Sequence, residues 1–205
     1  MSDKETIEVY KQLGKKYCKN IELLYIAELY KFMKLLPKNG EVLDVGCAGG
    51  RDTEEFIKNG FQVTGIDLVD EFLEGAKKFA SEGRFIKMDV ENLQFPSNYF
   101  DGIYAAAVLL HVAKNKIPAI LAIFHRILKA DGILFIGVKE GYGEKRVADD
   151  TLAGGLSRFY SFFSKEELTQ LLKQAGFDII FSRNVPDEAG RSEVHWIRII
   201  ARKQT

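Results

Sequence analysis

From residue 41 onward, the chain alternates short apolar segments with amphipathic ones, and this alternation constrains the fold more than any other feature of the sequence. Strands are predicted at 41–45, 62–66, 85–88, 100–104 and 133–138, and two further strands at 177–184 and 193–202. Helices are predicted at 52–60, 70–80, 117–129 and 164–176, and two more, at 5–19 and 21–36, precede the first strand.

Strands that alternate with helices form a mainly parallel sheet, because right-handed crossovers place the helices over its two faces. No helix separates the last two strands, so we expect them to pair as an antiparallel hairpin at one edge. The sequence therefore predicts a three-layer α/β sandwich. Its sheet is expected to be seven-stranded and mainly parallel, with an antiparallel last strand and helices on both faces. Asp52 and Glu55 are expected to form a capping box at the start of helix 52–60.

The composition favours one globular domain and excludes several classes of protein. A chain of 205 residues, 46% hydrophobic and 28% charged, predicts a single domain over residues 1–205. Its 29 basic and 29 acidic side chains leave no net charge to hold a nucleic acid or a membrane surface. No segment has the pattern of a secretion signal or a membrane span, and Cys18 and Cys47 lack metal-ligand spacing. We therefore expect a cytoplasmic protein, a monomer or homodimer, that uses no metal.

A glycine cluster follows the first strand directly, in residues 44–52 (DVGCAGGRD). Ligands of open α/β sheets bind beyond the carboxyl ends of the strands, close to the point where the strand order reverses. Glycines let the backbone approach a ligand there, and the start of the next helix supplies N–H groups. Asp67 ends the second strand, 21 residues after Gly46, where a carboxylate can accept two hydrogen bonds from a ribose diol. Together these features predict a site for a nucleoside-containing ligand.

Two ligands fit this pattern, a dinucleotide and S-adenosylmethionine, and the residues favour the second. A dinucleotide fingerprint requires a small residue where this chain has Arg51. Asp52 also places negative charge at the start of the helix, where it would repel a pyrophosphate. S-adenosylmethionine carries an ammonium and a sulfonium cation, so acidic surroundings suit it.

The sequence resembles the class I S-adenosylmethionine-dependent methyltransferases over about residues 40–140. Residues 42–50 (VLDVGCAGG) are similar to the first motif of that family, 65–68 (GIDL) to the second and 88–90 (MDV) to the third. Residues 100–105 (FDGIYA) are similar to the fourth, and 128–132 (LKADG) stand where the family has Leu-Lys-Pro-Gly-Gly. More narrowly, 109–112, 139–144 and 158–162 are similar to small stand-alone bacterial members. The resemblance implies a Rossmann-like fold, S-adenosyl-L-methionine as cofactor and S-adenosyl-L-homocysteine as product.

The resemblance also implies roles for individual residues. Gly46 and Ala48 would line the methionyl part of the cofactor, Asp67 would hold the ribose, and Asp89 with Val90 would contact the adenine. Ala48 departs from the family, which has a glycine there, and Gly49 with Gly50 would then supply the flexibility one residue later. The candidate cofactor-binding residues are Asp44, Gly46, Cys47, Ala48, Arg51, Asp67, Leu68, Asp89, Val90, Tyr104, Ala105 and Tyr17.

His111 is the candidate catalytic residue, because it follows the fourth strand at the rim where an acceptor would lie. An imidazole with a pKa of about 6.5 can take a proton near neutral pH. The alternative is that His111 only hydrogen-bonds its own loop. The candidate substrate-binding residues are His111, Arg158 and Tyr160. Residues 141–163 are a candidate lid, and the helices at 5–36 a candidate cap.

Three functions are compatible with the sequence. The compact size, balanced charge and candidate lid favour transfer of a methyl group to a small-molecule acceptor by direct in-line displacement. The sulfonium methyl is already activated, so the protein mainly aligns the acceptor, and a base is needed only if the acceptor carries its proton. A tRNA or protein methyltransferase is the second possibility, and it would need a basic surface stripe. A non-catalytic regulatory module that binds S-adenosylmethionine is the third.

Overall fold

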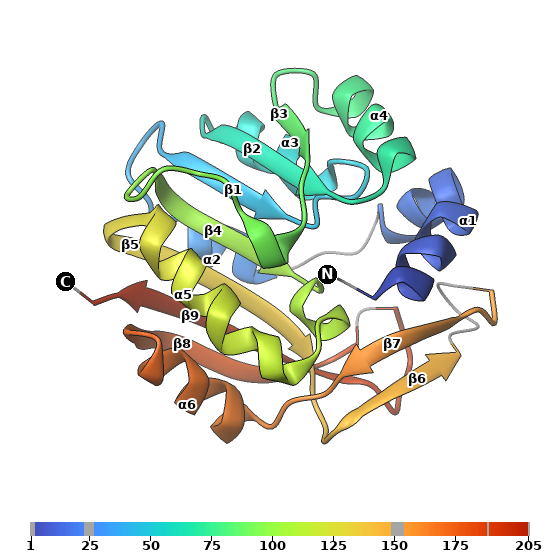
Figure 1. The fold of residues 1–205 in the computed structure, drawn as a ribbon. Helices are drawn as coiled ribbons and strands as arrows, with labels where there is room; N and C mark the ends of the chain where they lie inside the picture. The colour runs from blue at the N-terminus through green and yellow to red at the C-terminus, as the bar shows by residue number, and fades with distance from the viewer. Residues whose placement is uncertain (1–2, 23–26, 149–153, 188, 205) are drawn as a thin grey trace.

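The computed structural model describes residues 3–22, 27–148, 154–187 and 189–204. Seven strands form one sheet in the order β3-β2-β1-β4-β5-β9-β8 (Figure 1). Their bounds are β1 Glu41–Val45, β2 Gln62–Asp67, β3 Arg84–Lys87, β4 Phe100–Ala106, β5 Leu128–Lys139, β8 Phe177–Pro186 and β9 His195–Lys203. β1 to β5 are parallel to one another, whereas β9 is antiparallel to both β5 and β8. The predicted mainly parallel sheet with an antiparallel last strand is confirmed.

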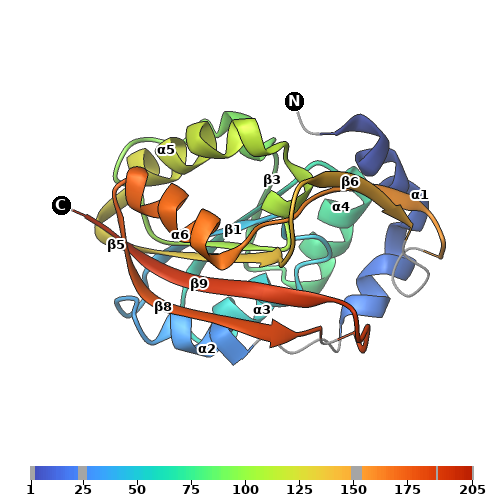
Figure 2. The ribbon, with the colours of Figure 1, turned by 90° about the horizontal axis from the view of Figure 1, so that it is seen from below.

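Helices cover both faces of the sheet, as the alternation predicted. α5 (Ile117–Ile127) and α6 (Lys165–Gln174) lie on one face, and α2 (Ala27–Met33) and α3 (Arg51–Lys58) on the other (Figure 2). α4 (Asp70–Phe79) connects β2 to β3. Each face has its own apolar core, with Phe124 of α5 in one and Phe32 of α2 in the other, both fully buried. β5 is apolar along its second half because its side chains enter both cores.

Two elements lie beyond the carboxyl ends of the parallel strands (Figure 1). One is α1 (Lys4–Ile21), where Asp3 caps the helix by accepting a hydrogen bond from the Thr6 amide at 2.8 Å. The other is a hairpin of β6 (Glu144–Ala148) and β7 (Ser157–Ser161), a two-stranded sheet that the sequence analysis did not predict. Residues 149–153, between its strands, lie outside the described part. Short 3₁₀ helices, η1 (Val90–Asn92), η2 (Leu109–His111) and η3 (Lys114–Lys116), complete the chain.

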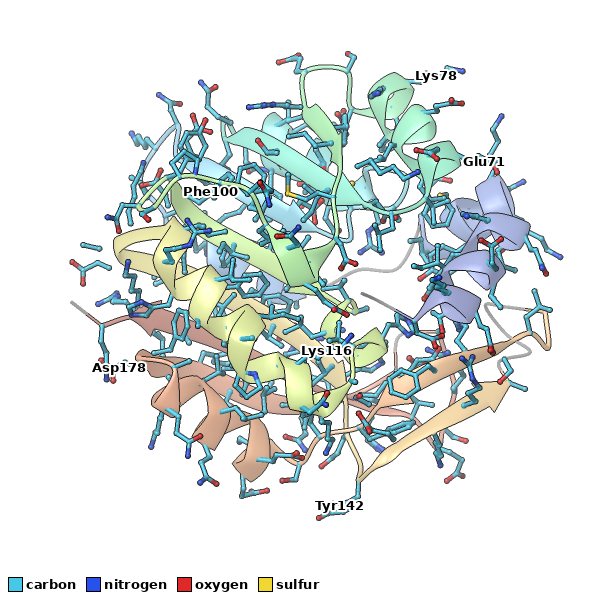
Figure 3. The ribbon with its side chains drawn as sticks, viewed as in Figure 1. Glu71, Lys78, Phe100, Lys116, Tyr142 and Asp178 are labelled. Atoms are coloured by element: carbon cyan, nitrogen blue, oxygen red, sulfur yellow. The ribbon has the colours of Figure 1, made fainter. Side chains whose placement is uncertain are left out.

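The helix at 21–36 is shorter than predicted, since α1 continues to Ile21 and α2 spans only Ala27–Met33. Residues 23–26 lie outside the described part. The described segments contain no helix long and apolar enough to cross a membrane. Phe79, Tyr142 and Ile180 are exposed on separate elements, and Tyr142 points outward at the turn before β6 (Figure 3). Single exposed apolar side chains of this kind are ordinary on a protein surface.

The predicted capping box at α3 is not formed. The residue that caps α3 is Gly50, in the left-handed conformation with φ 86°, and it makes no side-chain hydrogen bond. Asp52 lies inside the helix and pairs with Arg51 through two hydrogen bonds of 2.8 and 2.7 Å. The backbone conformation of Gly50 begins the helix, where the sequence pattern predicted a side-chain cap by Asp52.

Gly50→Ala is expected to destabilise the fold by about 1–3 kcal/mol, because a methyl group is strained at this φ. The new Cβ would also lie 3.1 Å from Cβ of Ala76 and 3.2 Å from its Cα. Thermal unfolding is the measurement, with an expected decrease of roughly 2–4 °C per kcal/mol for a chain of this length. Gly75→Ala on α4 is the matched control, since an added Cβ there meets nothing within 4 Å. Equal melting temperatures for the two variants would contradict the prediction.

Candidate active site

A cavity opens at the carboxyl ends of β1, β2 and β4 and is covered by α1. This is the edge of the sheet at which open α/β folds bind ligands. It lies at the strand-order reversal, since β1 has β2 on one side and β4 on the other. Ten of the residues predicted from the sequence line it, namely Tyr17, Asp44, Gly46, Cys47, Ala48, Arg51, Asp67, Leu68, Val90 and His111. The predicted glycine loop therefore forms one wall of this cavity.

The loop after β1 is shaped by positive backbone angles. Gly46 has φ 72° and Ala48 has φ 45°, so Ala48 itself adopts the left-handed conformation. The sequence predicted that Gly49 and Gly50 would supply the backbone flexibility of this loop. Gly50 does so with φ 86°, whereas Gly49 does not have a positive φ. Gly49 instead allows α1 to approach, since a Cβ there would lie 2.9 Å from Sγ of Cys18. The loop thus presents its backbone to the cavity while α1 packs directly behind it.

Asp67 holds this loop in place. Its carboxylate accepts hydrogen bonds from the amides of Ala48 at 3.0 Å, Leu68 at 2.7 Å and Val69 at 3.0 Å. Burial raises the pKa of Asp67, and the three amides oppose that shift because they favour the charged form. The carboxylate lines the cavity and is fixed by groups that carry no charge. A ligand that binds here meets a negative group held in one orientation.

Asp44 is a second carboxylate at the same end of the cavity. Its side chain is buried, and Oγ1 of Thr53 donates a hydrogen bond to it at 2.6 Å. Burial, with the neighbouring charge of Asp52, raises the pKa of Asp44 to about 7. Within the described residues, neither Asp44 nor Asp67 forms an ion pair with a lysine or arginine. These two carboxylates can therefore be compensated by a cation that a ligand supplies.

The stability of the ligand-free protein is expected to fall as the pH rises through about 7. The folded-state pKa of Asp44 lies above its ordinary 3.8, so the folded protein keeps a proton that the unfolded chain has lost. That contribution to stability disappears once Asp44 ionises in the buried site. Asp44→Asn should flatten the dependence of the melting temperature on pH between about pH 4 and 7, the interval between the unfolded and folded pKa values of Asp44. Asp70→Asn, which changes an exposed side chain on α4, is the control. Parallel curves for wild type and Asp44→Asn would contradict the assignment.

The side of the cavity next to β3 is apolar. Leu68, Met88 and Val90 line it. Asp89 does not line it, because its carboxylate turns back to accept a hydrogen bond from the Glu91 amide at 3.0 Å and caps η1. This apolar wall can hold a flat ring, and the hydrogen bond of Asp89 fixes the backbone conformation next to it.

The end of α1 and the glycine loop are tied together by Arg51. Its Nη1 donates to the carbonyl of Ile21 at 2.8 Å, while its Nε and Nη2 donate to the carboxylate of Asp52. Tyr17 lines the cavity from α1 and stacks on Phe72 of α4, with ring centroids 5.8 Å apart. α1 is thus fixed over the cavity by polar and aromatic contacts at its second half.

Tyr104 and Ala105 do not reach the cavity. Both are fully buried within β4, and the ring of Tyr104 stacks on Phe135 with centroids 4.5 Å apart. The cavity wall begins one residue later, at Ala106, and continues through Ala107 and Val108. The resemblance to the family implied a contact at Tyr104 and Ala105, whereas the residues that line the cavity begin at Ala106, the last residue of β4.

His111 lies in η2, in contact with two elements distant in sequence. Its Nδ1 lies 2.7 Å from the carbonyl oxygen of Phe159, so Nδ1 carries the proton and donates it. Its Nε2 therefore accepts the hydrogen bond from the hydroxyl of Tyr10 at 2.8 Å. Nη1 of Arg158 donates to the same hydroxyl at 2.7 Å. We call the three side chains of Arg158, Tyr10 and His111 the polar chain.

Burial lowers the pKa of His111 to about 3, with the charge of Arg158 acting in the same direction. The expectation of an imidazole that titrates near pH 6.5 is therefore corrected, and His111 is neutral at physiological pH. Arg158 and Tyr160 are each 2% exposed and do not line the cavity. Arg158 contacts Tyr10, which lines the cavity, and Tyr160 lies beside His111 with ring centroids 4.8 Å apart. Sequence reasoning identified the histidine but not its tyrosine partner.

The opposite end of the cavity is formed by residues that sequence reasoning missed. Phe135 and Gly137 of β5, Trp196 and Arg198 of β9, and Arg191 in the preceding loop line it. Because β9 is antiparallel, its beginning lies at the same edge as the ends of β4 and β5. The sequence did predict this antiparallel hairpin, and that pairing was the one signal that could have located them.

Comparison with known proteins agrees with this architecture. Residues 43–136 match a family model described as a methyltransferase domain. An O-methyltransferase of Penicillium expansum is 30% identical over 161 residues, which cover 72% of this chain and 56% of that protein. An S-adenosyl-L-methionine-dependent Diels-Alderase of Talaromyces variabilis is 32% identical over 105 residues, covering 47% of this chain and 35% of that protein.

A similar solved structure is that of the 1,6-didemethyltoxoflavin-N1-methyltransferase of Burkholderia thailandensis, which holds 1,6-didemethyltoxoflavin and S-adenosylhomocysteine. The TM-score is 0.73 at 26% identity, and the likeness covers 97% of this chain and 88% of that one. The chain spans about half the length of the curated relatives that it matches. Fold, cavity position and these likenesses agree, and the chain belongs to the class I S-adenosylmethionine-dependent methyltransferases.

Proposed function

We propose that the protein binds S-adenosyl-L-methionine at the end of the cavity lined by Asp44 and Asp67, and methylates a small-molecule acceptor. The observation that carries the proposal is the pair of carboxylates without a lysine or arginine partner among the described residues. A cofactor with an ammonium and a sulfonium would supply positive charge beside these two carboxylates. The acidic surroundings also disfavour a dinucleotide, whose pyrophosphate is negative.

The residues present fit the parts of this cofactor. Asp67, held by three amides, is assigned to the ribose hydroxyls, and Asp44 to the ammonium. Gly46 and Ala48 would lie along the methionyl chain, and the apolar wall that includes Val90 would receive the adenine. Cys47, Leu68, Arg51 and Tyr17 complete the cofactor end, and Asp89 supports it by capping η1. When bound, the cofactor supplies an activated methyl group for in-line displacement.

The elements around the cavity can exclude water during that transfer. We assign α1, within the proposed cap of residues 5–36, and the β6–β7 hairpin, within the proposed lid of residues 141–163, to this function. Thr6 of α1 accepts a hydrogen bond from the Phe159 amide of β7 at 2.9 Å. Arg146 of β6 pairs with Asp3 at 2.8 Å. These contacts connect cap and lid above the cavity, which supports a joint movement on ligand entry.

The polar chain provides a path for the proton of an acceptor. An acceptor hydroxyl or amine beside Tyr10 would hydrogen-bond to the phenol oxygen and give its proton to it, while Tyr10 passes its own proton to Nε2 of His111. The imidazolium formed would keep its Nδ1–H bond to the Phe159 carbonyl. With a pKa of about 3, His111 accepts only from a strongly acidic group. The protonated ether oxygen that forms when a hydroxyl is methylated before it loses its proton is such a group.

Two alternatives to methyl transfer are left to be tested, a different reaction and a regulatory role. The first is raised by the relative that is named as an S-adenosyl-L-methionine-dependent Diels-Alderase. The experiment is incubation with methyl-labelled S-adenosylmethionine and fractionated cell extract. We expect label in a small metabolite. Label in RNA or protein would favour those acceptors, and cofactor binding without any label transfer would favour a regulatory module or a different reaction.

We place the protein in the cytoplasm, as a monomer or homodimer.

A further inference from the structure

The cavity continues from the cofactor end across the sheet to a second end, whose floor is one row of the strand register. Ala106 of β4 lies opposite Gly137 of β5, and Gly137 lies opposite Arg198 of β9. Paired residues of neighbouring strands point to the same face, so these three share the floor. Two of them have almost no side chain. The floor therefore consists mainly of the backbone of Ala106 and Gly137, with the guanidinium of Arg198 beside it.

Gly137 is not required by the fold. It lies in the interior of a strand without a positive φ, where glycine weakens a sheet. The atoms nearest to a Cβ there would be the ring of Phe135 at 3.4 Å and Cα of Ala106 at 3.8 Å, which are ordinary contacts. Neither backbone conformation nor packing thus accounts for the missing side chain. Close approach of a ligand to the strand does account for it.

The walls of this end are aromatic. Phe135 lies two residues before Gly137 on the same face of β5, and Trp196 two residues before Arg198 on the same face of β9. The indole N–H of Trp196 donates to Asp187 at 2.7 Å, and Arg191 pairs with the same carboxylate at 2.7 Å. Trp196 is thereby fixed in orientation. A flat floor between two aromatic side chains suits a planar ring.

The charge at this end is opposite to that at the cofactor end. Arg198 is 4% exposed, and its Nη1 lies 2.7 Å from Oε2 of buried Glu28. The other oxygen of Glu28 pairs with Arg183. The carboxylate of Glu28 is thus shared by two guanidiniums, those of Arg183 and Arg198. A guanidinium that lines a cavity in this way matches the planar geometry of a carboxylate.

We propose that the acceptor is a planar aromatic acid. Its ring would lie on the backbone of Gly137 and Ala106, between Phe135 and Trp196, with its carboxylate toward Arg198. This inference rests on the proposed function, because it assigns the second end of the same cavity to the acceptor. The opposite charges of the two ends then direct the cationic cofactor and the anionic acceptor to their own sites.

The wild-type protein provides the first test. With S-adenosylhomocysteine at saturation, calorimetric titration with 2-, 3- and 4-hydroxybenzoate is compared with titration by the matching hydroxybenzamides. At least one acid is expected to bind 10-fold or more tightly than its neutral amide. Trp196 is the sole tryptophan of the chain, so quenching of its emission, corrected for absorbance, reports binding at this end. Equal affinity for each acid and amide, or no binding by any acid, would overturn the proposal.

Gly137→Ala provides the second test. The added methyl group should weaken binding of the acid 10-fold or more and leave the affinity for S-adenosylhomocysteine within 2-fold. Gly75→Ala on α4 makes the same chemical change outside the cavity and should alter neither affinity. Unchanged binding of the acid by Gly137→Ala would contradict the proposed floor.

Arg198→Met should remove the preference for acid over amide, and Gly137→Ala remains informative if that variant does not fold. Failure of the wild type to bind S-adenosylhomocysteine would instead reject the proposed function. A wild type that binds it but does not distinguish acid from amide would reject only the inference about the acceptor.

Discussion

His111→Ala is expected to lower turnover by about 100-fold, the order of magnitude that a positioned proton acceptor contributes. The variant loses Nε2, which accepts the hydrogen bond from Tyr10, and Nδ1, which donates to the Phe159 carbonyl. The affinity for S-adenosylhomocysteine should stay nearly unchanged, because Asp44 and Asp67 lie at the cofactor end. Steady-state kinetics on the identified acceptor, together with calorimetric titration of S-adenosylhomocysteine, measure the two effects separately.

Two further variants distinguish proton transfer from positioning. Tyr10→Phe keeps the ring and removes the hydroxyl that lies between Arg158 and His111, so it should lose turnover to a similar degree if the proton passes through Tyr10. His111→Gln should recover part of the activity if hydrogen bonding to Tyr10 is all that is needed. Full turnover in His111→Ala would make the residue structural and would leave Tyr10 and Arg158 as the groups to examine.

The pH dependence provides an independent check on His111. Because burial lowers its pKa to about 3, turnover at saturating cofactor should show no step near pH 6.5 from this residue. A step there that disappears in His111→Ala would show that the imidazole is more exposed to water in the working enzyme. Cofactor affinity should instead decrease as the pH falls through about 7, because Asp44 then becomes neutral and no longer attracts an ammonium.

Asp67→Ala is expected to weaken S-adenosylmethionine binding by about 1.5–3 kcal/mol, roughly 10- to 150-fold in affinity. The variant loses a charged hydrogen-bond acceptor for the ribose. It also frees the amides of Ala48, Leu68 and Val69, which the carboxylate now holds, so the loop after β1 loses a fixed point. Calorimetric titration with S-adenosylhomocysteine measures the loss.

Asp101→Ala is the matched control for Asp67→Ala. Asp101 lies near the start of β4, at the amino end of the parallel strands, where it accepts from the Glu41 amide and from Lys129. Its loss should cost stability without changing cofactor affinity. NADH should not bind measurably to the wild type. Unchanged affinity in Asp67→Ala would exclude the ribose assignment, and tight NADH binding would contradict the assignment of the cofactor.

Much of the cofactor end was determined by local sequence. The strand before Gly46 and the strand that ends at Asp67 are neighbours both in the chain and in the parallel sheet. A helical crossover makes the second strand run parallel to the first, and parallel pairing places their carboxyl ends side by side. For this reason Gly46, Ala48 and Asp67 could be assigned to one site without coordinates. The same reasoning placed Tyr104 too deep, because the sequence does not show at which residue a strand leaves the sheet.

The hydrogen bonds of the polar chain were decided by tertiary structure alone. Tyr10 and His111 are 101 residues apart, and Arg158 and Tyr10 are 148 apart, so no local pattern indicates that they hydrogen-bond. Burial then moved the pKa of His111 away from its ordinary range, which depends on elements that fold over it. The sequence by itself determined which edge of the sheet holds the cavity, since the local alternation of strands and helices makes the strands parallel and gathers their carboxyl ends at one edge. Only the folded chain determined which distant side chains close that edge, because their contacts depend on the packing of α1, β7 and β9 against it.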